Sequence, residues 1–177
     1  MKDDSQIWDI KLGKKRTFAF TEGYALDRKR DLTTFAKSLP EGIALCSSDH
    51  IAGRQHAENV LTQAAESFDR EIYLARNRSI DLIMRITGQS QISKALDTSG
   101  LKNISNVAVF GLSTTKRRIK SVELLLGKMG TRDDGVLDMN PRKEKLLREF
   151  FLLPSFIKKD QIPLLLSEKS AILVFPK

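Results

Sequence analysis

The chain has 177 residues, of which 41% are hydrophobic and 29% are charged. This balance is typical of a globular protein that buries a core, and it argues against intrinsic disorder. No apolar run is long enough for a membrane-spanning helix, and the single cysteine, Cys46, excludes an internal disulfide and a cysteine-based zinc site. The first residues are polar, without the apolar stretch of a signal peptide, so we expect a soluble, cytoplasmic protein with no membrane contact.

The net charge is +8, because 30 Lys and Arg side chains outnumber 22 Asp and Glu side chains, and the isoelectric point is near 9.7. A basic surface attracts polyanions, which makes nucleic acid a plausible partner. Many basic proteins nevertheless bind no specific anion. Charge alone therefore leaves both possibilities open.

The first 15 residues are mixed and polar around Trp8, a pattern typical of a flexible arm or a weak edge element. Three elements are predicted after them: a strand at 17–21, a short helix at 32–38 and a buried strand at 43–46. Gly23 is expected to end the first strand, and Pro40 with Gly42 to close the helix.

The middle of the chain has the clearest helical periodicity. A helix is predicted after Asp49, because apolar residues recur at helical spacing at positions 57, 60, 61, 64 and 68. A mostly apolar helix follows at 79–86, and Ser90 is expected to cap a second, shorter one. Gly100 stands where a left-handed helix cap is expected, and a buried strand is predicted at 107–112.

The last third is predicted to be mainly helical. One helix spans 113–126, another begins at Asn140 and Pro141, and a last one includes 164–166. An apolar run at 171–175 predicts a closing strand. About seven helices around a small mixed or antiparallel sheet define an α+β fold, predicted as a single compact domain over residues 1–177.

A search for catalytic residues finds little. His50 and His56 are six residues apart on one predicted helix, which places them on different faces and favours surface or capping roles over a shared metal. Asp133, Asp134 and Gly135 lack the other ligands of a calcium loop and are typical of a turn. Cys46 lies in an apolar run, as a buried, inert thiol would. We therefore expect no catalytic residues, no metal and no cofactor.

Basic residues gather at the start of the helix predicted at 113–126. They are Lys116, Arg117, Arg118 and Lys120. Positive charge at the amino end of a helix opposes the helix dipole, so this placement is unfavourable unless an anion binds there. The alternative is an ordinary solvated helix face. The pattern alone does not distinguish the two.

The connection between the helices at 79–86 and after Ser90 is the second candidate. Arg85 is followed by Gly88 and by polar side chains at the exposed start of the next helix, where phosphates and base edges could be contacted. The alternative is structural: Arg85 pairs with Asp81 one turn earlier, and the amides only cap the helix.

Residues 83–96, IMRITGQSQISKAL, resemble the signature of the PRPK-binding protein (TPRKB-like) family of KEOPS subunits, archaeal type. That signature is an apolar helix ending in arginine, then glycine, a glutamine–isoleucine pair and a nearby alanine. The resemblance continues through the helix after Asp49, the strand at 107–112, the segment 138–149 and the apolar run at 171–174. Two features depart from the pattern: the polar stretch before Thr17 is long, and Asp81 stands where glutamate is commoner.

The resemblance implies a compact α/β fold and a non-catalytic subunit of the complex that installs threonylcarbamoyladenosine on tRNA. It also implies two partners, a kinase-like ATPase subunit and the single-stranded CCA end of tRNA. The residues that we expect to bind tRNA are Arg85, Gly88, Gln89, Gln91, Ile92, Lys94, Lys116, Arg117 and Arg118. Those that we expect to bind the kinase, from the excess of apolar residues near the carboxyl end, are Phe156, Ile157, Leu164 and Leu165.

Within the tRNA set, Arg85 or Lys94 would meet phosphate, Gln89 and Gln91 would reach base edges, and Gly88 would let the backbone approach. Because the chain has few aromatic residues, Ile92 would pack against the bases, and the cluster at 116–118 would add nonspecific attraction. Two alternatives stay open: an enzyme that acts on tRNA or a nucleotide, and a purely protein-binding regulator of the kinase without RNA contact.

Overall fold

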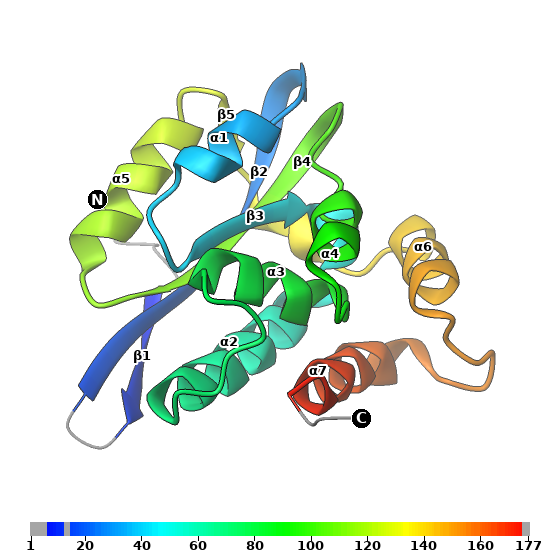
Figure 1. Ribbon diagram of the computed structural model, residues 1–177. Coiled ribbons are helices and arrows are strands. Elements are labelled where there is room, and N and C mark those ends of the chain that lie inside the picture. The colour runs from blue at the N-terminus through cyan, green and yellow to red at the C-terminus, as the bar shows by residue number, and fades with distance from the viewer. Residues whose placement is uncertain (1–6, 13–14, 175–177) are drawn as a thin grey trace.

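The computed structural model describes residues 7–12 and 15–174 (Figure 1). Within these ranges the chain forms seven α-helices, three short 3₁₀ turns and a five-stranded sheet, which confirms the α+β prediction. The strands are β1 (Ile7–Leu12), β2 (Lys15–Arg30), β3 (Ile43–Ser47), β4 (Ile104–Ser113) and β5 (Gly130–Arg132). The helices are α1 (Thr33–Ser38), α2 (Gly53–Asp69), α3 (Arg78–Thr87), α4 (Ile92–Thr98), α5 (Lys116–Leu126), α6 (Pro141–Phe151) and α7 (Ile162–Ile172).

The sheet is antiparallel and has the order β1-β2-β4-β3. β2 is its longest strand and has three partners: β1 near its start, β4 along most of its length and β5 near Tyr24. Strands β1, β4 and β5 therefore pair directly with β2, and β3 is joined to it through β4. The position of β2 thus determines the positions of the other strands.

Both faces of the sheet are buried. Side chains alternate along each strand, so neighbouring residues point to opposite faces. Phe20, Tyr24 and Val109 point into one core, which also contains apolar residues of α1 and α5. Ala19 and Phe110, one position away on the same strands, point into a second core with α2 and α3. Helices α1 and α5 thus cover one face and α2 and α3 the other (Figure 1).

Helices α6 and α7, here called the C-terminal helix pair, form a third cluster beside this sandwich (Figure 1). Its buried residues are Ala52, Leu147, Phe151, Ile162 and Leu166. α6 starts as predicted: the Asn140 side chain accepts a hydrogen bond from the Lys143 backbone N–H, and Pro141 occupies the first turn. α7 packs on α2 and α3, which attaches the pair to the second face of the sheet.

Two predictions of local structure are wrong. The strand expected at 171–175 is instead the end of α7 as far as Ile172, and residue 175 lies outside the described residues. A short apolar run is the same signal for a buried strand and for a helical turn, so the helix that begins at Ile162 simply continues. Ser90 does not cap α4, whose N-cap residue is Gln91. The segment 7–12 is the edge strand β1, one of the two alternatives expected for it.

β2 also runs past Gly23, which was expected to end it. A Cβ atom at Gly23 would lie 2.5 Å from the Asp133 carbonyl oxygen, so this glycine allows a neighbouring segment to approach the strand. In this strand the glycine allows the backbone near Asp133 to approach closely, and it does not mark a turn.

Gly111, near the end of β4, provides a test of close packing within the sheet. A Cβ atom there would lie 2.6 Å from the Gly42 carbonyl oxygen and 2.9 Å from Ile43 Cα, both backbone atoms that cannot move aside alone. We expect Gly111→Ala to lower the free energy of unfolding by about 2–3 kcal/mol, measured by urea denaturation.

The control is Gly127→Ala, because Gly127 has helical backbone angles (φ −60°, ψ −19°) that alanine adopts without strain. It should change the stability by less than about 0.5 kcal/mol. Similar losses for the two variants would show that Gly111 is not required by close packing.

Candidate nucleic-acid interface

Helix α3 contains a buried ion pair. Arg85 Nε donates to Asp81 Oδ1 at 2.6 Å, and the two side chains are 1% and 0% exposed. Asp81 Oδ2 also accepts hydrogen bonds from the backbone N–H groups of Leu74 and Ala75, at 2.5 and 3.3 Å. The pair thus fastens the segment before α3 to the middle of the helix.

This geometry corrects the role expected for Arg85. Its guanidinium is packed inside the protein, 5.9 Å from the centre of the Phe68 ring, and cannot reach a phosphate without leaving Asp81. Removing one member of a buried pair leaves an uncompensated charge, which is strongly unfavourable. The structural alternative, an ion pair with Asp81, is the arrangement that the structure shows.

Gly88 ends α3 in the left-handed conformation, with φ of 63° and ψ of 27°. The next backbone N–H, that of Gln89, donates to the Met84 carbonyl at 3.0 Å, which closes the helix in the usual glycine-capped way. A Cβ atom at Gly88 would lie 3.2 Å from the ring of Phe151 in α6. The left-handed turn and the packing against Phe151 are therefore sufficient to explain why a glycine occupies position 88, without any contact between its backbone and a ligand.

The residues after Gly88 turn outward. Gln91, Ile92 and Lys94 are exposed, Ile92 by 44%, and Gln89 is half-buried. Gln91 makes no side-chain capping bond to α4, although it is the N-cap residue. Only Ala95 on this helix is buried. An amide, an aliphatic group and a cation are therefore presented together on α4 without an evident role in the fold.

The basic cluster lies elsewhere. Lys116, Arg117 and Arg118 are exposed at the start of α5, where Lys116 Nζ lies 5.5 Å from the centre of the Phe18 ring. α5 covers the face of the sheet opposite to α3, so the sheet separates the cluster from Gln91 and Lys94 (Figure 1). The sequence placed these residues in one candidate set, but the structure does not bring them together.

The apolar residues expected to bind a protein partner lie in the C-terminal helix pair and its connecting loop. Phe156 is 79% exposed and Leu164 is 53% exposed, whereas Ile157 and Leu165 are half-buried. Sequence reasoning missed Leu152, which is 86% exposed and adopts a left-handed backbone with φ of 52°. Leucine is unfavourable in this conformation. No sequence pattern indicates it, since glycine is the usual residue there.

The histidines and the cysteine are in the interior. His50 ends a 3₁₀ turn and His56 belongs to the first turns of α2, so the prediction of one shared helix is wrong. His56 is fully buried, which excludes a surface role; its Nδ1 accepts the Ala52 N–H at 3.2 Å, and burial lowers its pKa to about 3. Cys46 is buried as expected, and burial raises the pKa of its thiol.

Lys143 is a further buried cation that the sequence analysis missed. Its ammonium group donates to the Val136 carbonyl at 2.7 Å, and burial lowers its pKa to about 8. Asp133 accepts the Gly135 N–H at 3.0 Å, so this acidic segment is a turn, as predicted. Among the residues that the structure describes, no group of His, Cys, Asp or Glu side chains is arranged to hold a metal ion.

Within the same residues, no helix combines the length and the apolar character needed to span a membrane. The chain matches no protein-family model. It is similar to the regulatory protein Cgi121 of Methanocaldococcus jannaschii, with 29% identity over 112 residues. The aligned region covers 63% of this chain and 71% of that protein.

The buried pair in α3 yields a prediction that separates folding from binding. Arg85→Met keeps the length of the side chain but leaves Asp81 without its cation. We expect the free energy of unfolding to fall by about 3–5 kcal/mol in urea denaturation.

Arg78→Met is the matched control, because Arg78 lies on the same helix, contacts the same Phe68 ring and is exposed. It should cost less than about 1 kcal/mol. A stable Arg85→Met variant with weakened RNA binding would instead restore Arg85 as a phosphate ligand.

Proposed function

We propose that this chain is a regulatory KEOPS subunit of the TPRKB-like family, and that it binds the kinase-like ATPase subunit of the complex and the 3′ CCA end of tRNA. In this role it would support the threonylcarbamoyladenosine modification of tRNA without taking part in the chemistry. The buried state of Cys46 and His56 agrees with a non-catalytic subunit. Turnover by the isolated chain that one substitution abolishes would contradict this part of the proposal.

One observation carries the RNA-binding part. The family signature continues beyond the buried α3 into α4, where Gln91, Ile92 and Lys94 are exposed. Amides can contact base edges, an aliphatic group can pack on a base and a cation can meet phosphate, which is the combination that single-stranded RNA requires. The net charge of +8 adds long-range attraction.

The basic cluster on α5 would have a different task. It lies across the sheet from α4 and cannot contact the same nucleotides as Gln91. We therefore assign it to nonspecific contact with duplex phosphates, such as those of the acceptor arm. Contacts of this kind depend on salt and not on sequence.

The second candidate function, a protein-binding regulator without RNA contact, is favoured by the exposed apolar residues of the C-terminal helix pair. Leu152 is informative because its side chain contributes little burial while its backbone is strained. Phe156 and Leu164 add exposed apolar surface in the same part of the chain. We propose that these three residues bind the kinase subunit, in place of the half-buried Leu165.

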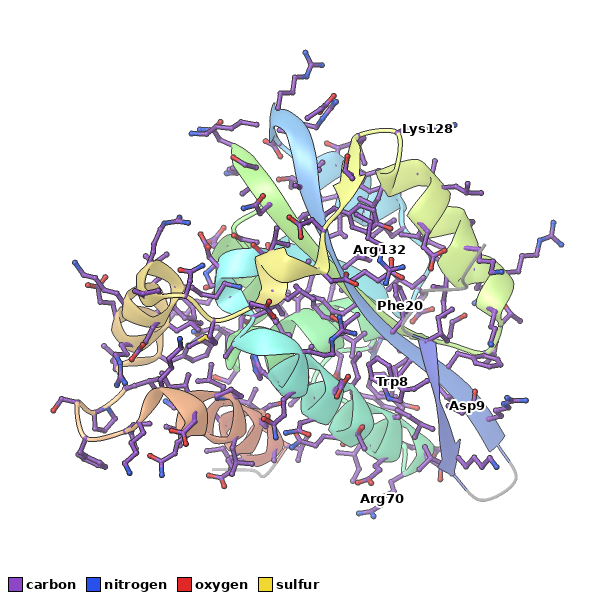
Figure 2. The ribbon with its side chains drawn as sticks, turned by 180° about the vertical axis from the view of Figure 1, so that it is seen from behind. Trp8, Asp9, Phe20, Arg70, Lys128 and Arg132 are labelled. Carbon is purple, nitrogen blue, oxygen red and sulfur yellow. The ribbon has the colours of Figure 1, made fainter. Side chains whose placement is uncertain are left out.

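For RNA binding, the decisive measurement is a titration with full-length tRNA and with tRNA that lacks its last three nucleotides. The wild type should lose roughly tenfold in affinity on trimming, because base contacts to the 3′ end disappear. Gln91→Ala should bind full-length tRNA more weakly and lose much less on trimming. Lys128→Ala, an exposed lysine beyond the end of α5 (Figure 2), is the control and should behave as the wild type.

A triple substitution of Lys116, Arg117 and Arg118 by alanine should weaken both tRNAs equally. The slope of log affinity against log salt should become shallower by roughly two units. Equal wild-type affinity for both tRNAs would rule out the CCA site and leave the protein-binding alternative.

For the kinase contact, Leu152→Gly separates stability from binding. Glycine adopts the left-handed conformation freely, so the variant should gain about 1 kcal/mol in stability. It should nevertheless bind the kinase subunit more weakly, as should Phe156→Glu, in calorimetric titrations. Ile172→Ala, a 63% exposed apolar residue of α7 outside the proposed set, is the control. Unchanged affinity of both variants would place the kinase surface elsewhere.

A further inference from the structure

A buried carboxyl group lies under α5. Glu22 is on β2 between Phe20 and Tyr24, and the alternation of the strand points all three toward the core that α5 covers. Glu22 is fully buried, and its neighbour across the strands is the apolar Val109. An ionised carboxylate is unfavourable in such surroundings unless other groups compensate it.

The groups around Glu22 offset only part of the free-energy cost of a buried negative charge. The Tyr24 hydroxyl donates to Glu22 Oε2 at 3.0 Å, and Arg132 of β5 forms an ion pair with Oε1 at 3.1 Å. Phe20 and Arg132 lie on the side of β2 that faces α5 (Figure 2). From α5 itself, the carboxyl of Glu123 lies beside that of Glu22 and disfavours its ionised form. Two carboxyl groups that meet in a buried site cannot both ionise readily, and a proton on one of them allows a hydrogen bond between them.

The charges of the surrounding network lead to the same conclusion. Arg132 is shared with Asp134, at 3.1 Å, and Asp134 in turn lies 3.6 Å from Arg54 of α2. The network holds three carboxyl groups, those of Glu22, Glu123 and Asp134, against two guanidinium groups. One proton makes it neutral. Glu22 Oε1 and Glu123 Oε1 are both buried, and neither has a hydrogen-bond partner among the described residues.

We propose that the buried Glu22 carries a proton that it donates to the carboxyl of Glu123, that this contact fastens α5 to the sheet, and that loss of the proton loosens the helix. Burial, together with the neighbouring Glu123, raises the pKa of Glu22 to about 7, against the opposing effects of Arg132 and Tyr24. The folded state therefore holds the proton over a pH range in which a solvated glutamate has lost it. The stabilisation is complete below about pH 4.5 and is lost as the pH rises through about 7. This inference does not depend on the proposed function.

The test is amide hydrogen exchange of α5 between pH 5 and pH 8, corrected for the intrinsic effect of pH on exchange. In the wild type, protection of α5 should fall roughly tenfold or more between pH 5 and pH 7 and then level off. Protection of α3, on the other face of the sheet, should stay constant. Wild-type protection of α5 that does not change with pH would overturn the proposal.

Glu123→Gln replaces the carboxyl beside Glu22 by an amide, which can donate to an ionised Glu22. Because burial, the largest cause of the raised pKa of Glu22, remains, the α5 protection of this variant should depend on pH less than that of the wild type and should exceed it at pH 8. Glu149→Gln, at an exposed glutamate that pairs with Lys145 on α6, should keep the wild-type profile. A full pH dependence in Glu123→Gln would also overturn the proposal.

Infrared spectroscopy provides a readout that does not depend on the stability of any variant. At pH 6, the wild type should show the carbonyl band of a protonated carboxyl group shielded from solvent, and the band should disappear above pH 8. Glu22→Gln should lack it, and Glu149→Gln should retain it. A wild-type spectrum without this band at pH 6 would show that the pair holds no proton.

Discussion

Strands β2 and β4 are buried on both sides, and the rest of the structure follows from this constraint. Along β4, Val107 and Val109 enter the core shared with α5, while Ala108 and Phe110 enter the core shared with α2 and α3. A sheet with two apolar faces needs helices on both. Helix α5 packs on one face of the sheet and α3, which leads into α4, on the other, so the basic residues of α5 and the exposed residues of α4 lie on different layers of the fold.

The same burial explains the polar groups that the interior retains. Asp81 and Arg85 compensate each other and satisfy two backbone N–H groups. Glu22 accepts a hydrogen bond from the Tyr24 hydroxyl and forms an ion pair with Arg132 of β5. Both clusters connect segments that apolar packing alone would leave free to shift. A buried polar group of this kind contributes little net stability but penalises alternative arrangements.

Sequence reasoning predicted those parts of the fold in which local pattern and tertiary environment agree. Amphipathic α2 and the capped start of α6 belong to this class. It failed where long-range contacts decide: Gly23 accommodates a distant segment, and residues 171–172 continue a helix. The candidate site shows the same division. Exposure of Gln91 and Lys94 followed from their pattern, but the burial of Arg85 depends on segments that the local sequence does not specify.

The contacts of α4 connect the two proposed binding surfaces. Two glycines flank the segment that contains α4: Gly88 ends α3, and Gly100 follows α4. A Cβ atom at Gly88 would be 3.2 Å from the Phe151 ring of α6, and one at Gly100 would be 3.1 Å from His50 Cε1. The His50 ring in turn packs edge-on against Phe150, with centroids 5.0 Å apart. The turn before α4 therefore packs against α6, whereas the segment after α4 reaches α6 only through His50. Phe150 and Phe151 belong to the turn of α6 that leads into the strained Leu152, so the segments around α4 and Leu152 share packed aromatic neighbours.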